Sequence, residues 1–168
     1  ALSWPVLMDV TRETALTTAK LFMVVFGAMI FSNFVNRAGL PDGLLSIVNG
    51  FDVSPLGVIF IILAIYLVLG CVFESLSMIL LTVPIFAPVV EALGFDLVWF
   101  GILVVVATEI SLITPPIGLN VFVLKGVLKD VPVSTIFKGV TPFWIADIFR
   151  LLLLALIPAI ALYLPSLM

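Results

Sequence analysis

The sequence has 168 residues, of which 64% are hydrophobic and only 10% are charged, and its mean hydropathy is +1.42. A water-soluble fold cannot bury so large an apolar fraction, so the composition predicts an integral membrane protein. The net charge of −3 is spread along the chain without a run of Lys or Arg, which excludes nucleic acid as a partner. With one cysteine, Cys71, and no histidine, a disulfide framework, a Cys/His metal site and a histidine-based catalytic triad are also excluded.

The first expected elements are a spanning helix and a surface helix. Residues 1–37 contain an apolar stretch long enough for one crossing, at about 20 residues per span, after a polar N-terminal lead. Residues 38–54 have apolar side chains clustered between turn-forming ends, which predicts a short amphipathic helix at the membrane interface.

Residues 55–90 form two apolar arms separated by the segment 70–75. Each arm is too short for a comfortable crossing, and Pro84 and Pro88 interrupt the second. We therefore expect a hairpin that returns to its own side, with its tip at residues 70–75. The charge pattern does not separate a re-entrant hairpin from two full spans, since both return.

Residues 97–128 form a long apolar run that Pro115 and Pro116 interrupt. Two consecutive prolines remove backbone donors and push the preceding Thr114 away from helical geometry. A broken spanning helix is expected, with its unwound part at residues 113–118.

Two further segments complete the chain. A short amphipathic segment is expected at residues 131–139 and a final spanning helix at 140–168. Asp147 and Arg150 lie three residues apart in this helix, and we expect a neutralised structural pair rather than a proton relay.

The charged residues predict an orientation if the hairpin returns and the double-proline segment crosses once. The expected cytoplasmic face then carries most of the cations, and the expected periplasmic face carries the hairpin ends, the C-terminus and most of the anions. The cations are Arg12, Lys20, Lys125, Lys129 and Lys138; the anions are Asp42, Asp52, Glu91 and Asp96; Arg37 is the exception on the acidic face.

The two interruptions are the chemically informative features, because backbone groups released from helical bonding cannot face lipid. Discontinuous membrane helices in secondary transporters direct helix N-termini at anions and unwound carbonyls at sodium. Suitable oxygen-bearing side chains lie beside both breaks, namely Glu74, Ser75 and Ser77 at the first and Thr108, Glu109, Ser111, Thr114 and Asn120 at the second.

Four motifs in these segments resemble one family. They are GCVFES at residues 70–75, LTVPIF at 81–86, VWFG at 98–101 and EISLITPPIGLN at 109–120. Together they resemble the large membrane subunit of tripartite ATP-independent periplasmic (TRAP) transporters, over nearly the whole chain. The resemblance implies an all-α fold of the ion-transporter superfamily, an elevator-type repeat with a re-entrant hairpin and a broken helix. Only the second repeat is represented, and the chain opens at Ala1 without a Met or a signal-peptide pattern, so we expect the C-terminal half of a longer subunit.

The resemblance also implies a site between the hairpin tip and the unwound segment. One sodium would bind through the backbone carbonyls of Gly70 and Thr114, with Gly118 giving close approach and the hydroxyls of Ser75 and Thr114 as second-choice ligands. The substrate carboxylate would lie beside these groups. Its expected donors are Ser75 and Asn120, and the expected structural residues at the site are Glu74, Glu109, Pro115 and Pro116. Direct contact with the ion is the alternative for the two glutamates, and a simple kink in a continuous helix is the alternative for the two prolines.

The implied function is sodium-coupled import of an organic anion across the bacterial inner membrane. The implied partners are a small membrane subunit, a periplasmic binding protein, the remaining N-terminal repeat and the lipid bilayer, with no cofactor besides the coupling ion. An assembly anchor without its own ion site is the main alternative; a channel lacks a polar stripe, and an enzyme lacks a nucleophile with a base. Trp4, Trp99 and Trp144 are expected to be interfacial anchors, and Cys71 a packing residue.

Overall fold

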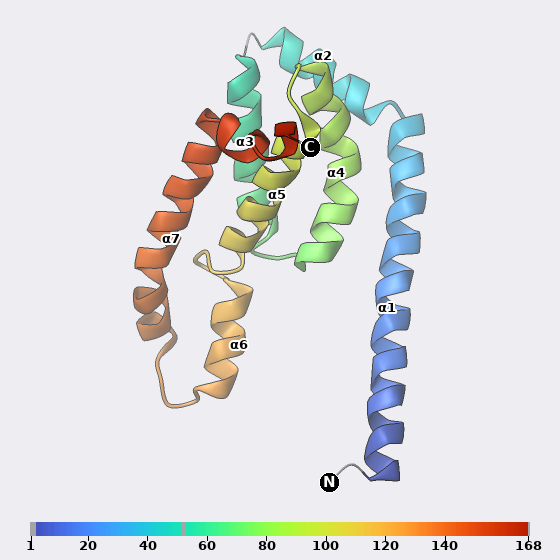
Figure 1. Ribbon diagram of the computed structural model, residues 1–168, viewed down its shortest axis with the longest axis vertical. Coiled ribbons are helices and arrows are strands. Elements are labelled where there is room, and N and C mark those ends of the chain that lie inside the picture. The colour runs from blue at the N-terminus through green and yellow to red at the C-terminus, as the bar shows by residue number, and fades with distance from the viewer. Residues whose placement is uncertain (1–2, 52, 168) are drawn as a thin grey trace.

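The computed structural model describes residues 3–51 and 53–167, and within these ranges it contains helices and no strand. The all-helical character that the sequence predicts is confirmed. The elements in chain order are α1 (Trp4–Arg37), α2 (Leu40–Gly50), α3 (Pro55–Leu69), α4 (Ser75–Ala92), α5 (Leu97–Ser111), α6 (Leu119–Val127), α7 (Val133–Leu156), α8 (Ala159–Leu162) and a final 3₁₀ turn at Pro165–Leu167 (Figure 1). Asp52, which the charge pattern assigned to the acidic face, lies outside the described residues.

Helix α1 stands at one side of the molecule and is its longest element (Figure 1). Its 34 residues extend about 51 Å at 1.5 Å per residue, well beyond the roughly 30 Å of a bilayer's hydrocarbon. Residues 21–36 contain no charged side chain, so this C-terminal half is the part suited to lipid. Within the described chain, α1, α4 and α7 are long and apolar enough to cross a membrane, whereas α3 and α5 are shorter.

Helices α3 and α4 form an antiparallel hairpin whose turn lies well inside the length of α1 rather than at its end (Figure 1). The 15 residues of α3 extend about 22 Å and the 18 residues of α4 about 27 Å. Thr82 and Tyr66 share a hydrogen bond of 2.7 Å between their hydroxyls, which joins the two arms partway along their length. Because this bond is partly buried, it holds the arms at a fixed separation.

Helix α5 runs back from the far end of α4, and α6 continues in the same general direction after an interruption at the level of the hairpin turn (Figure 1). Helix α7 then returns beside them. The buried core lies mainly between α3, α4 and α5, with Leu151 and Ala155 of α7 closing one side. Trp99 and Phe100 are the largest side chains that α5 contributes.

One segment boundary differs from the sequence expectation. A separate surface segment was predicted at 131–139, but residues 133–139 and the start of the expected final span belong to a single helix, α7, which ends at Leu156 before Pro158. Pro142 lies inside α7 without ending it. Because proline has no backbone N–H, Pro142 leaves the carbonyl of Lys138 without its helical partner. Lys138 is exposed, so this carbonyl can find a polar partner outside the helix.

The charged residues divide between the two ends of the molecule. The connection from α6 to α7 contains Lys129 and lies toward the end that holds the N-terminus, whereas α2 and the connection from α4 to α5 lie toward the opposite end (Figure 1). Asp42 is in the first turn of α2, and Asp96 caps α5. This separation agrees with the two groups of charges defined from the sequence.

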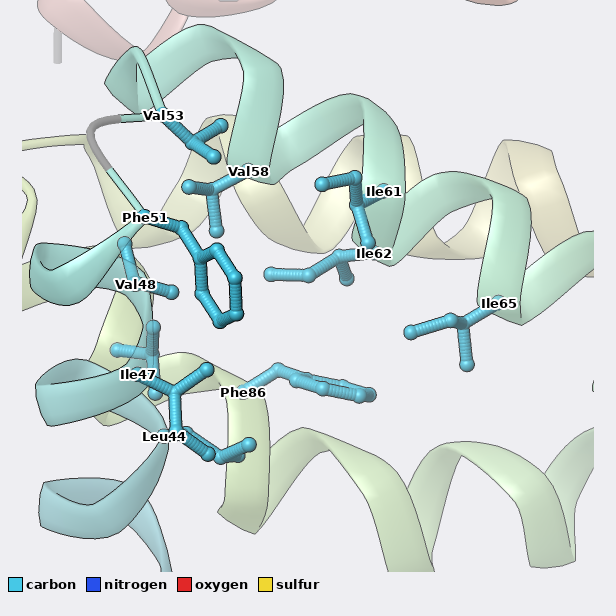
Figure 2. Close-up of a pocket in the computed structure, with 11 residues that line it drawn as sticks. Leu44, Ile47, Val48, Phe51, Val53, Val58, Ile61, Ile62, Ile65 and Phe86 are labelled. Atoms are coloured by element: carbon cyan, nitrogen blue, oxygen red, sulfur yellow. The ribbon is translucent and has the colours of Figure 1, made fainter.

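An apolar groove of about 350 Å³ lies between α2, α3 and α4, away from the hairpin turn (Figure 2). Phe51, Val58 and Phe86 project into it in Figure 2. Its lining consists of aliphatic and phenylalanine side chains, so it offers no charged group to a ligand. The groups that could bind an ion lie elsewhere, at the hairpin turn.

Candidate functional site

The tip of the hairpin and the end of α5 approach each other more closely than side chains would allow. Gly70 ends α3 and is buried, and a Cβ atom built on it would overlap the side chain of Ser111, the last residue of α5. Ser111 is 0% exposed. Glycine is required at position 70 because only its hydrogen fits against the serine.

Cys71 extends this contact toward the break. Its sulfur lies 4.0 Å from the carbonyl oxygen of Ser111 and 3.9 Å from that of Thr114, and the residue is buried. The expectation of a packing role agrees with this position. The hairpin tip therefore faces carbonyl oxygens at the end of α5 and in the interruption. The Cys71 thiol is at most a weak hydrogen-bond donor to them.

The interruption between α5 and α6 covers residues 112–118 and includes a cis peptide bond between Pro115 and Pro116. The backbone N–H of Asn120 donates to the carbonyl of Leu112 at 3.1 Å, which closes the loop over the interruption. Gly118 has φ of +41°, a left-handed conformation that favours glycine. A Cβ there would lie 3.2 Å from the carbonyl oxygen of Thr114, so the glycine also gives this carbonyl room.

The hydroxyl of Thr114 has two hydrogen-bond partners. It donates to the carbonyl of Ile110 at 2.7 Å, and it accepts the indole N–H of Trp144, from α7, at 2.9 Å. Trp144 was not among the expected site residues, and its separation of 30 positions from Thr114 gives no sequence signal of the contact.

The prediction that Trp99 is an interfacial anchor is wrong, whereas Trp144 is half-buried and makes the hydrogen bond to Thr114 described above. Trp99 is 1% exposed and donates its indole N–H to the carbonyl of Leu154 at 2.8 Å. That carbonyl needs a partner because Pro158, four residues later, has no N–H to offer it. Both indoles therefore connect α7 to α5 or to the residues directly after it, while Trp4 is exposed on α1.

Two helix N-termini lie at the site, and only one of them has a side-chain cap. Glu74 caps α4 by accepting the backbone N–H groups of Leu76 at 3.1 Å and Ser77 at 3.0 Å. Ser75, the first residue of α4, is half-buried directly beyond this cap. Helix α6 begins after Gly118 without a side-chain cap, and Asn120 lies exposed in its first turn. Most first-turn N–H groups of α6 already have backbone partners, because Asn120 donates to the Leu112 carbonyl and both Val121 and Phe122 donate to the Gly118 carbonyl. The Leu119 N–H and the Asn120 side chain are therefore what this terminus can offer to an anion.

Within the described chain, Glu109, unlike Glu74, makes no hydrogen bond to the backbone. It lies exposed on α5, and among the described residues its carboxylate has no hydrogen bond or ion pair that would hold the interruption in place. The bonds that do hold the interruption come from Thr114, Asn120 and Trp144.

The donor set at the site suits a hard monovalent cation. Within the described residues, no group of three or more His, Cys, Asp or Glu side chains could hold a metal ion. What the tip and the interruption bring together are backbone carbonyls and the Thr114 hydroxyl, which are neutral oxygen ligands. Neutral oxygens are appropriate for an alkali cation and poor for a transition metal.

The relatives of this chain are transport proteins. Residues 1–160 match the sequence profile of the DctM component of the tripartite ATP-independent periplasmic transporters. The chain is 34% identical over 160 residues to the sialic acid TRAP transporter large permease of Vibrio cholerae, covering 95% of this chain and 37% of that protein. It is 32% identical over 157 residues to the C4-dicarboxylate TRAP transporter large permease of Pseudomonas aeruginosa, covering 94% and 36%. It is 34% identical over 159 residues to the ectoine TRAP transporter large permease of Halomonas elongata, covering 94% and 37%.

The match covers almost all of this chain but well under half of each relative. The motifs that carried the resemblance in the sequence all lie within the matched residues. The chain therefore belongs to the DctM component family of the tripartite ATP-independent periplasmic transporters.

Proposed function

We propose that this chain is part of a sodium-coupled secondary transporter that imports an organic anion, and that it contributes one sodium site to that transporter. The contact of Gly70 with Ser111 carries the proposal, because it brings two interruptions in apolar helices to one point. Backbone groups released by both interruptions then need a partner other than lipid. A bound cation and a bound carboxylate supply such partners.

Sodium binds where the hairpin tip faces the interruption. Its first ligands are the backbone carbonyls of Gly70 and Thr114, with the hydroxyls of Thr114 and Ser75 completing the shell, and the missing side chain of Gly118 leaves the Thr114 carbonyl accessible. These groups come from segments that are separate in the chain. Binding therefore favours the arrangement in which tip and interruption are together.

The substrate carboxylate binds beside the ion at the N-terminus of α6. This end has no side-chain cap, whereas Glu74 already accepts the first N–H groups of α4. Asn120 and Ser75 are the side chains placed to donate hydrogen bonds to the anion. The relatives whose names specify sialic acid and C4-dicarboxylates support a carboxylate as the substrate class.

The hairpin of α3 and α4 is re-entrant, and the whole unit moves through the membrane as a rigid body in an elevator mechanism. The shortness of α3 and the position of the hairpin turn inside the length of α1 support this arrangement, although α4 by itself is long enough to cross a membrane (Figure 1). The remaining N-terminal part of the subunit, a small membrane subunit and a periplasmic binding protein are its partners in the bacterial inner membrane. The end with the α6–α7 connection is cytoplasmic, because it carries the lysines.

The test is sodium-dependent uptake by the full-length parent subunit with its partners in proteoliposomes. Thr114→Val keeps the shape of the side chain and removes the hydroxyl, so the sodium concentration for half-maximal uptake should rise. Thr141→Val is the matched control, because the Thr141 hydroxyl makes the same type of bond, to Phe137 four residues earlier at 2.8 Å, on an exposed part of α7. Unchanged sodium dependence in Thr114→Val, or equal uptake with and without a sodium gradient, would reject the proposal and favour an assembly anchor.

A further inference from the structure

Trp144 determines how the Thr114 hydroxyl can be used. An indole N–H is a donor only, so the bond of 2.9 Å requires the Thr114 oxygen to accept. The single hydroxyl proton then points to the carbonyl of Ile110, 2.7 Å away. A hydroxyl has one proton and two lone pairs, so these two bonds leave one lone pair and no proton.

We propose that Trp144 is a positioning residue of the sodium site: it keeps the Thr114 proton on the Ile110 carbonyl, so that the hydroxyl can offer a ligand only a lone pair, and it holds this hydroxyl at the interruption from α7. The inference rests on the proposed function, because it needs a cation at Thr114. It also distinguishes between cation binding and carboxylate binding by Thr114, which the sequence could not do. With its proton committed, the Thr114 oxygen suits a cation and offers nothing to a carboxylate, so the substrate has to find its donors elsewhere.

The second indole contact shows why α7 holds this position firmly. Trp99 of α5 donates to the Leu154 carbonyl near the end of α7, while Trp144 donates to Thr114 just after the end of α5. Helices α5 and α7 are thus joined by one indole bond toward each end of α5. The two bonds are chemically alike, but only that of Trp144 reaches a proposed ion ligand, so Trp99 provides a matched control.

The experiment compares Trp144→Phe with Trp99→Phe in the full-length parent subunit with its partners, by sodium titration of uptake in proteoliposomes. Loss of one neutral hydrogen bond that acts on sodium affinity should raise the half-maximal sodium concentration by about two- to tenfold in Trp144→Phe. Trp99→Phe should lower the melting temperature and leave the sodium dependence within about twofold of the parent. The substrate KM at saturating sodium should not change in either variant, because neither indole contacts the substrate.

Two further variants test whether Trp144 acts through Thr114. Replacement of Trp144 by β-(3-benzothienyl)alanine keeps the ring shape and removes the N–H, so the shift should persist even if phenylalanine packs poorly. The double variant Trp144→Phe with Thr114→Val should match Thr114→Val alone, because the indole has no hydroxyl left to orient.

The outcomes separate this inference from the proposed function. If Thr114→Val shifts the sodium dependence and both Trp144 replacements leave it unchanged, the positioning role is refuted and the sodium site stands. An additive double variant refutes the positioning role as well. If Thr114→Val itself has no effect on sodium dependence, both proposals fail.

Discussion

Replacing Gly70 by alanine should separate the hairpin tip from the interruption. A Cβ at this position would lie 2.5 Å from the Cβ of Ser111 and would overlap its hydroxyl. Neither neighbour is the far end of a flexible side chain, because Ser111 is fully buried and its hydroxyl donates to the Thr108 carbonyl. The overlap must therefore move backbone, and overpacking of this kind costs about 1–3 kcal/mol.

That cost acts on sodium affinity if sodium binds only when tip and interruption are together. A penalty of about 1–3 kcal/mol corresponds to a rise of roughly 5- to 150-fold in the sodium concentration for half-maximal uptake. Gly101→Ala in α5 is the control, since a Cβ there meets nothing within 4 Å. It should leave sodium dependence unchanged, because alanine is also the better helix former.

The rescue experiment makes the reasoning sharper. Ser111→Gly removes both clashing atoms and should restore much of the sodium affinity to Gly70→Ala, whereas Ser111→Ala keeps the Cβ contact and should restore little. Sodium titration of uptake measures all four variants. If Gly70→Ala behaves like Gly101→Ala, the tip does not pack on Ser111 in the working transporter, and the site as described is refuted.

Three further changes test the supports of the site. Glu74→Ala removes the cap of α4 and should destabilise the subunit by about 1 kcal/mol, seen as a lower melting temperature in detergent, whereas Glu74→Asp should lose less. Trp99→Phe should lower the melting temperature less when Pro158→Ala is also present, because the alanine N–H can donate to the Leu154 carbonyl that the indole no longer reaches. Equal losses with proline and with alanine at position 158 would contradict this. Asp147 and Arg150 lie 3.1 Å apart, which confirms the expected pair, so Asp147→Asn should lower the yield of folded subunit more than the double change with Arg150→Gln.

Local features of the fold follow from residues that can be recognised in the sequence. Asp96 accepts the N–H groups of Val98 and Trp99 at the start of α5, and Ser54 accepts that of Gly57 at the start of α3. Such caps, together with the apolar composition, are sufficient to predict an all-helical membrane chain. Family membership was also predictable, because the motifs at residues 70–75 and 109–120 are contiguous in the sequence.

Contacts between segments were not predictable in the same way. The approach of Gly70 to Ser111 spans 41 positions and depends on the path of the turn, which composition does not determine. Trp144 has the pattern of an interfacial residue by its place near a span end, yet its indole pairs with Thr114. A single proline does not reveal whether a helix will continue, and Pro142 within α7 is such a case.

The proposed sodium site, built from carbonyl and hydroxyl oxygens, has a consequence for coupling. Its ligands are neutral, and the nearby Glu74 carboxylate is already shared by two N–H groups of α4, so a bound sodium would bring an almost uncompensated charge into an apolar surrounding. A carboxylate at the N-terminus of α6, which has no side-chain cap, would bring the opposite charge to the same place. Each ion then lowers the cost of burying the other, and by linkage each raises the other's affinity by the same factor. In the proposed site, coupled binding of sodium and anion would therefore require no titratable side chain of the protein.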